Sequence, residues 1–145
     1  MSDHENYPDV FHFNDDYENF EDHGKSNGMR FWYATDLAKL LGYENYNTFV
    51  RGAINRAIAA CTALGIDVMD NFGQCSREID GKIQADMKLS RFACYLAAMN
   101  GDPKKPQVAA AQAYFATIAE SFRRYFQEAD HVERVAIRED VSERE

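Results

Sequence analysis

Residues 31–43 read FWYATDLAKLLGY, and this stretch decides how the fold begins. The apolar, aromatic run Met29–Ala34 predicts a short strand. Thr35 is a suitable N-cap, and Gly42 is the residue type that most often ends a helix. A short helix over Asp36–Leu41 is therefore expected directly after the strand.

A longer helix is expected next, from Tyr46 to Leu64, with Gly65 at its end. Its apolar residues recur at the helical period and predict one buried stripe, made of Val50, Ala53, Ile54, Ala57, Ile58, Cys61 and Leu64. The following residues, 66–76, are expected to be irregular.

A hairpin and a third helix are predicted after this irregular segment. Asp80-Gly81 is a two-residue hairpin signal. Over Lys82–Leu89, apolar residues alternate strictly with Lys82, Gln84, Asp86 and Lys88. This alternation predicts a half-buried strand whose polar set faces water. Ser90 then caps a helix over Arg91–Met99.

A long C-terminal helix is expected from about Pro106, because no Gly or Pro occurs between Gln107 and Glu145. Asp130 with Glu133 resembles a capping box and predicts a break there. An apolar stripe follows steps of three and four residues, namely Phe115, Ile118, Phe122, Tyr125, Ala129 and Val132. The stripe is interpreted as intramolecular core, and the seam of a homodimer is the alternative.

These elements predict an α+β fold, with a small antiparallel sheet or hairpin packed by several helices and a long C-terminal helix. Charge divides the chain. Residues 1–24 hold eight acids and no Lys or Arg, residues 25–127 thirteen bases and nine acids, and residues 128–145 three bases and seven acids. We expect an acidic N-terminal segment (1–24), a mildly basic domain (25–128) and a charged helix (129–145). Within the first, residues 15–22 are expected to form a short helix that docks Tyr17 and Phe20.

The sequence offers little support for an enzyme. It contains no P-loop, GxGxxG, GxSxG or HExxH motif, so neither catalysis nor a cofactor or metal is expected. Cys61, Cys75 and Cys94 are an odd number without a CxxC, which indicates reduced thiols and a cytoplasmic protein. No apolar run approaches the ~20 residues of a membrane span.

Three basic features are candidates for binding DNA. In a helix-turn-helix interpretation, four residues of the longer helix would reach base edges, namely Asn47, Thr48, Arg51 and Asn55, and a plain αα-hairpin is the alternative. Arg77, Lys82, Lys88 and Arg91 could follow a phosphate backbone, or form a solvated sheet face. Lys104 and Lys105 precede a helix whose free N–H groups attract anions, or lie in an ordinary surface loop.

Aromatic residues add a fourth candidate. Phe31, Trp32 and Tyr33 could stack on unpaired bases, although consecutive aromatics in a strand more often belong to a core. Lys39, in the short helix, is a further residue that could touch DNA.

The stretch FWYATDLAKLLGYENYNTF resembles the signature of the BRO-N domain, found in baculovirus repeated-ORF proteins and phage antirepressors. The segments KLSRFACYLAAMNGDPKKPQVAAAQAYFA (88–116) and VERVAIRED (132–140) are similar to the damage-inducible D proteins of bacteria. The resemblance spans residues 29–140 and implies an α+β domain with a role in DNA binding or DNA transactions. It supplies no catalytic residue.

The resemblance carries over a set of motif residues, most of them typical of caps, turns and core: Ala34, Asp36, Leu37, Leu41, Gly42, Tyr43, Ser90, Arg91, Tyr95, Leu96, Asn100, Gly101, Asp102 and Pro103. Arg91 is the exception, since it is charged where a core residue would serve.

The leading hypothesis is a non-enzymatic regulatory protein that binds duplex or single-stranded DNA, in a DNA-damage response or phage-type regulation. The alternative is a protein-interaction module that modulates a recombinase or repressor, with the acidic ends acting as a DNA mimic. A homodimer through the C-terminal helix is considered, and no membrane partner is expected. A further hypothesis is that residues 1–24 fold back over the basic domain and weaken DNA binding.

Overall fold

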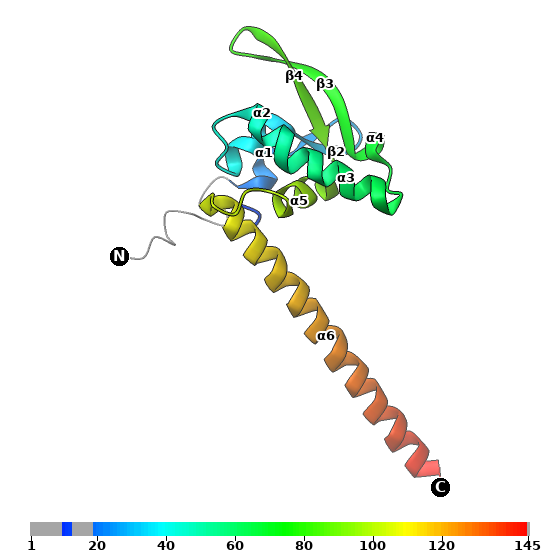
Figure 1. The fold of residues 1–145 in the computed structure, drawn as a ribbon. Coiled ribbons are helices and arrows are strands. Elements are labelled where there is room, and N and C mark those ends of the chain that lie inside the picture. The colour runs from blue at the N-terminus through cyan, green and yellow to red at the C-terminus, as the bar shows by residue number, and fades with distance from the viewer. Residues whose placement is uncertain (1–9, 13–18, 145) are drawn as a thin grey trace. The chain divides into compact units, whose positions relative to one another are not determined.

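The computed structural model describes residues 10–12 and 19–144, with residues 135 and 137–144 described by their backbone alone. Two compact units make up the chain, residues 1–112 and 113–145. The predicted α+β fold with a long C-terminal helix is confirmed (Figure 1). The elements are the short 3-10 helix η2 (Phe20–His23), β1 (Lys25–Ser26), β2 (Arg30–Tyr33), α1 (Ala34–Leu40), α2 (Tyr46–Phe49), the π-helical turn η3 (Val50–Ile54), α3 (Asn55–Leu64), α4 (Val68–Asn71), β3 (Phe72–Ile79), β4 (Lys82–Leu89), α5 (Arg91–Met99) and α6 (Pro106–Arg144).

The strands form one antiparallel sheet in the order β1-β2-β4-β3. Residues paired directly across two strands share a face of the sheet. Trp32 and Phe72 both pair with Leu89, and all three side chains are buried, so they define the inner face. Tyr33 pairs with Lys88 and lies on the opposite face, called the outer face below.

Some of the N-terminal residues that the structure describes belong to the core, namely Val10, Phe11 and Phe20. Phe20 is fully buried, and its ring stacks on Trp32 with centroids 4.3 Å apart. The Trp32 indole N–H donates to the Phe20 carbonyl at 2.8 Å. The prediction that Phe20 docks on the domain is confirmed, whereas Tyr17 lies outside the described residues.

Strand β2 runs directly into α1, and a carboxylate from β4 holds this junction. The Thr35 backbone N–H donates to Asp86 Oδ1 at 3.1 Å, and the Thr35 hydroxyl donates to Oδ2 at 2.6 Å. The N-cap of α1 is Tyr33, which makes no side-chain capping bond. Asp86 therefore satisfies the helix end from a distant strand.

Two predictions are wrong at this junction. Thr35 is not the N-cap, because it already lies in the first turn of α1. Asp86 does not face water, because the donors of Thr35 take up its carboxylate and its side chain has no exposed surface.

Helix α1 ends as predicted at Gly42, whose φ of 83° is left-handed. The Gly42 N–H donates to the Lys39 carbonyl, and the Tyr43 N–H donates to the Ala38 carbonyl. This pair of bonds is the Schellman motif, which requires a residue that tolerates positive φ.

The longer helix from Tyr46 to Leu64 is confirmed, but it contains the π-helical turn η3 in its first half. Leu64 is 75% exposed, so its place in the predicted buried stripe is wrong. Phe49, which lies outside that stripe, is fully buried. A π turn widens the helix locally and changes the angular spacing of side chains, which a uniform period of 3.6 does not anticipate. The buried stripe consists of Phe49, Ala53, Ile54, Ala57 and Cys61.

The prediction that residues 66–76 are irregular is wrong. They contain α4 and most of β3. Three of the four half-buried positions of β3 carry Gly73, Cys75 and Arg77, and only the last carries a large apolar residue, Ile79, so the alternation of this strand is not visible in its composition. The predicted hairpin turn is confirmed, since Asp80 and Gly81 have φ values of 53° and 79°.

The hairpin β3–β4 extends beyond the helices that cover its base (Figure 1). The prediction of a half-buried β4 is confirmed only near its end, where Met87 and Leu89 are buried. Ile83, near the tip of the hairpin, is 79% exposed.

The predicted α5 and α6 are confirmed. The Ser90 hydroxyl accepts from the Ala93 N–H and caps α5. Helix α6 begins at Pro106 but has no break at Asp130, whose carboxylate pairs with Arg134 at 3.0 Å. No helix in the described residues has an apolar stretch long enough to cross a membrane.

The apolar stripe of α6 is not core in the unit formed by residues 113–145. Ile118, Phe122, Tyr125 and Val132 are exposed, with Phe122 at 59%. A single helix has nothing of its own to cover such a stripe, so these residues form no core within this unit.

Candidate nucleic-acid interface

The helix formed by α2, η3 and α3 presents three of the candidate residues to solvent. Asn47, Arg51 and Asn55 are all exposed. Asn45 anchors the start of the helix, since its side chain accepts from the Thr48 N–H at 3.3 Å. Amide and guanidinium groups can form paired hydrogen bonds with base edges, so this surface has the chemistry that base recognition needs. Arg51 lies within the π-helical turn, a feature often found at functional sites.

Lys39 lies beside the hairpin. An open hollow of about 130 Å³ separates α1 and α2 from the distal strands, and Lys39, Tyr46, Ile79 and Gln84 are among its lining residues. Burial, with smaller contributions from Asp86 and Cys75, raises the pKa of Tyr46 to about 12. The Tyr46 hydroxyl is therefore a neutral hydrogen-bonding group, and Lys39 supplies the positive charge of this hollow.

The three basic residues of the hairpin have different environments. Lys82 is exposed near the tip. The Arg77 guanidinium donates to Asp36 at 3.0 Å and lies 4.1 Å from the centroid of the Tyr33 ring. The Lys88 ammonium lies 4.9 Å from the centroid of the Phe31 ring. The structure thus pairs Arg77 and Lys88 with two aromatic rings of β2.

Arg91 is half-buried and is engaged in contacts within the domain. Its guanidinium forms hydrogen bonds with both carboxylate oxygens of Glu21 and lies 4.8 Å from the centroid of Trp32. The bonds to Glu21 raise the pKa of Arg91. This explains why the motif has a charged residue at this position: Arg91 fastens the N-terminal segment over the core.

Lys104 and Lys105 precede α6 but differ in their contacts. Lys104 is exposed, whereas the Lys105 ammonium donates to the Gly42 carbonyl at 3.4 Å and lies over the Tyr43 ring. The Asp102 N–H donates to the Tyr43 hydroxyl at 2.9 Å. The loop before α6 is therefore fixed to the end of α1, and Lys104 is the residue of the pair that remains available to a ligand.

The cysteines are poor candidates for nucleophiles. All three are free thiols, as predicted. Burial raises the pKa of Cys61 and Cys75, and raises that of Cys94 well above its usual range. Thiols of this kind remain protonated near neutral pH and react slowly. Within the described residues, no group of three or more His, Cys, Asp or Glu side chains is placed to hold a metal ion.

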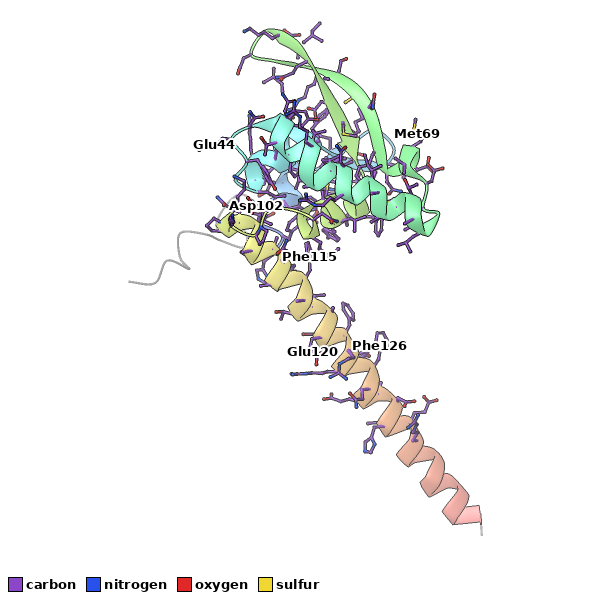
Figure 2. The ribbon with its side chains drawn as sticks, in the orientation of Figure 1. Glu44, Met69, Asp102, Phe115, Glu120 and Phe126 are labelled. Atoms are coloured by element: carbon purple, nitrogen blue, oxygen red, sulfur yellow. The ribbon has the colours of Figure 1, made fainter. Side chains whose placement is uncertain are left out.

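Sequence reasoning missed a hollow beside the outer face of the sheet. It has a volume of about 170 Å³ and lies between the β1–β2 turn, α4 and β4. Phe31 and Lys88 form one side, and Met69, which Figure 2 labels on α4, lies on another. Neighbouring residues of a strand lie on opposite faces of the sheet, so Phe31 and Trp32 cannot share a face. This alternation was the one sequence signal that could have indicated an aromatic ring on the outer face.

The chain is similar in sequence to known proteins over most of its length. Residues 23–116 match the BRO family, N-terminal domain. The chain is 42% identical over 96 residues to DNA damage-inducible protein D of Escherichia coli (strain K12), a match that covers 63% of this chain and 35% of that protein. The chain therefore spans about a third of the length of this relative. No solved structure matches the chain. The chain belongs to the BRO family through an N-terminal domain of that family at residues 23–116.

Proposed function

We propose that this protein is a non-enzymatic regulator that binds DNA, acting in a DNA-damage response or in phage-type regulation. Its family is regulatory and of a DNA-binding type, and its relative is named for DNA damage. The observation that supports DNA binding best is the exposed helix surface of Asn47, Arg51 and Asn55. Base recognition uses these side-chain types, because Asn and Arg can form paired hydrogen bonds with base edges.

Positioning on DNA would come from Lys39, Lys82 and Lys104. These lysines are exposed, and none of them forms an ion pair within the described part of the chain. Lysines of this kind contact phosphates and release counterions without reading sequence. By contrast, the guanidiniums of Arg77 and Arg91 are held by Asp36 and Glu21 and contribute less to a phosphate contact.

The experiment is a measurement of duplex DNA affinity over a salt series. Because each phosphate contact contributes a slope of about 0.9 in log K against log salt, Lys104→Gln should reduce the slope by about that amount. Arg134→Gln in α6 removes the same charge from the second unit and is the matched control. A slope unchanged by Lys104→Gln would remove this lysine from the interface, and no binding at low salt would refute the proposal.

A charge reversal at Lys104 and Lys105 together should weaken DNA binding further. Lys105 also contacts Gly42 and Tyr43, so the double variant must be compared with Lys105→Gln alone for stability. If the double variant and Lys105→Gln lose the same DNA affinity and the same stability, the loss of affinity comes from the fold rather than from phosphate contacts.

We also propose that the acidic N-terminus weakens DNA binding. A deletion that tests this must remove acidic residues without removing buried ones. Removal of residues 1–24 would delete Phe11 and Phe20, which are buried, and would unfold the domain rather than unmask it. Removal of residues 1–9 deletes three acids and leaves those rings in place. We expect this shorter deletion to raise DNA affinity at low salt, and an unchanged affinity would contradict the idea.

A second candidate function is a protein-interaction module, and α6 supports it. Ile118, Phe122 and Tyr125 are exposed along one helix. Their steps of three and four residues are those of a coiled-coil seam, so a second copy of this chain is the partner that they favour. Binding to a recombinase or repressor would be the further step, and co-purification of such a partner without any DNA binding would favour this function over the first.

A further inference from the structure

We propose that the hollow beside Phe31 binds one unpaired base of single-stranded DNA. This inference rests on the proposed DNA binding and specifies single-stranded DNA as the ligand of this surface. It concerns the outer face of the sheet, which is distinct from the helix surface of Asn47, Arg51 and Asn55.

The first argument is the placement of aromatic rings. Phe31 and Tyr33 are two residues apart on β2, so both lie on the outer face while Trp32 is buried on the inner face. Both rings are half-buried and meet edge to face at 5.3 Å. Rings at the surface of a sheet are platforms for base stacking, because every base has a π-face.

The second argument is the positive charge beside the rings. Lys88 lines the hollow, and its ammonium lies 4.9 Å from the Phe31 centroid. Lys25 pairs with Phe31 across the β1–β2 ladder and is exposed. A strand of DNA whose bases stack on the rings would find these cations within reach of its phosphates.

The third argument is the hollow itself. Its volume of about 170 Å³ exceeds the roughly 150 Å³ of an engineered cavity that takes up benzene, so one planar ring can enter. Met29 and Met69 border it and are 77% and 76% exposed, and thioether side chains adapt readily to flat ligands. Asn27 and Asp70 add polar groups that can meet the hydrogen-bonding edge of a base.

Duplex DNA is a poorer ligand for this surface. Its bases are stacked on one another, and only their edges are open in the grooves. An unpaired base exposes its faces and its pairing edge together, which is what a ring wall and neighbouring polar groups can bind.

The test compares Phe31→Ala with wild type on an oligo-dT strand and on a duplex of equal length. Loss of one stacked base should lower affinity for the single strand about 5- to 150-fold and leave duplex affinity unchanged. Phe31→Tyr keeps the ring and should retain binding. Phe92→Ala removes an exposed ring from α5, outside the hollow, and is the matched control.

Three outcomes would overturn the inference. If Phe31→Ala leaves single-strand affinity unchanged while DNA is still bound, the hollow is not the site and the proposed function stands. Equal losses on both DNAs would assign the effect to folding. If wild type binds neither DNA, the proposed function itself fails, and this inference with it.

A measurement without any substitution guards against misfolding of the variant. Ultraviolet cross-linking of wild type to oligo-dT, followed by peptide mapping, should place the link at Phe31 or Tyr33. A link found only in other segments would overturn the inference.

Discussion

The most informative perturbation of the fold is Asp86→Ala. Asp86 lies on β4 with no exposed side-chain surface, and its carboxylate accepts from the Thr35 N–H, the Thr35 hydroxyl and the Met87 N–H. Arg77 is 3.9 Å away. Each hydrogen bond to a charged group contributes about 1.5–3 kcal/mol, and removal of one partner of a buried pair costs about 3–5 kcal/mol. We therefore expect a loss of roughly 3–5 kcal/mol in the free energy of unfolding.

Urea unfolding followed by Trp32 fluorescence measures this loss, because the chain has one tryptophan and it is fully buried. Asp80→Asn is the matched control: it removes the charge of an aspartate in the same hairpin, at an exposed turn position that asparagine tolerates. A change of less than about 1 kcal/mol for Asp86→Ala, near the size of one ordinary hydrogen bond, would refute the view that this carboxylate caps α1.

Three further predictions concern other contacts. Glu21→Gln should lower the urea midpoint, because it removes the charge that holds Arg91; a midpoint equal to that of wild type would show that this pair adds no stability. Tyr46→Phe should reduce the decrease in the free energy of unfolding that wild type shows as the pH rises. Because the pKa of Tyr46 is raised to about 12, its contribution to the free energy of unfolding is complete below pH 10 and is lost as the pH rises from 10 to 12. Urea unfolding of both proteins at pH 8 and at pH 11 should show this difference. Phe122→Glu should convert a dimer to a monomer in sedimentation experiments, and wild type that is monomeric at all concentrations would exclude the α6 seam.

Local signals predicted much of the fold. Gly42, Gly65 and the Asp80-Gly81 turn all occur where the chain needs positive φ, and they fixed the ends of two helices and the position of the hairpin. Ser90 and Pro106 marked the starts of α5 and α6. Signals of this kind act within a few residues, so they can be interpreted without knowledge of the tertiary structure.

Strand β3 shows where local interpretation fails. Its half-buried positions lie on the outer face and include Gly73 and Cys75, so no alternation of large apolar residues is visible there. The strand exists because β4 pairs with it along its whole length, from Phe72 with Leu89 to Ile79 with Lys82. A hairpin needs two strands, and extension of β4 back through the turn would have predicted this partner.

The candidate site was less accessible to prediction than the fold. The charge of a residue is visible in the sequence, but its partner is not. Arg77 and Arg91 looked equivalent to Lys82 and Lys104, yet Asp36 and Glu21 hold the two arginines from distant parts of the chain. The alternation of a strand already implies that Phe31 and Trp32 lie on different faces. The hollow beside Phe31 could not be predicted, because residues of α4 form part of its lining.

The position of β3 at the edge of the sheet has a consequence for the behaviour of concentrated solutions. An edge strand of eight residues leaves a row of backbone groups to which another molecule could add a strand. The exposed residues of β3 are Gln74, Ser76 and Glu78, and the half-buried Arg77 carries charge between them. These polar side chains are poor partners for stacking between molecules. The colloidal stability of the domain thus depends on a few side chains of one strand, and apolar substitutions there would promote aggregation without any loss in the stability of the monomer.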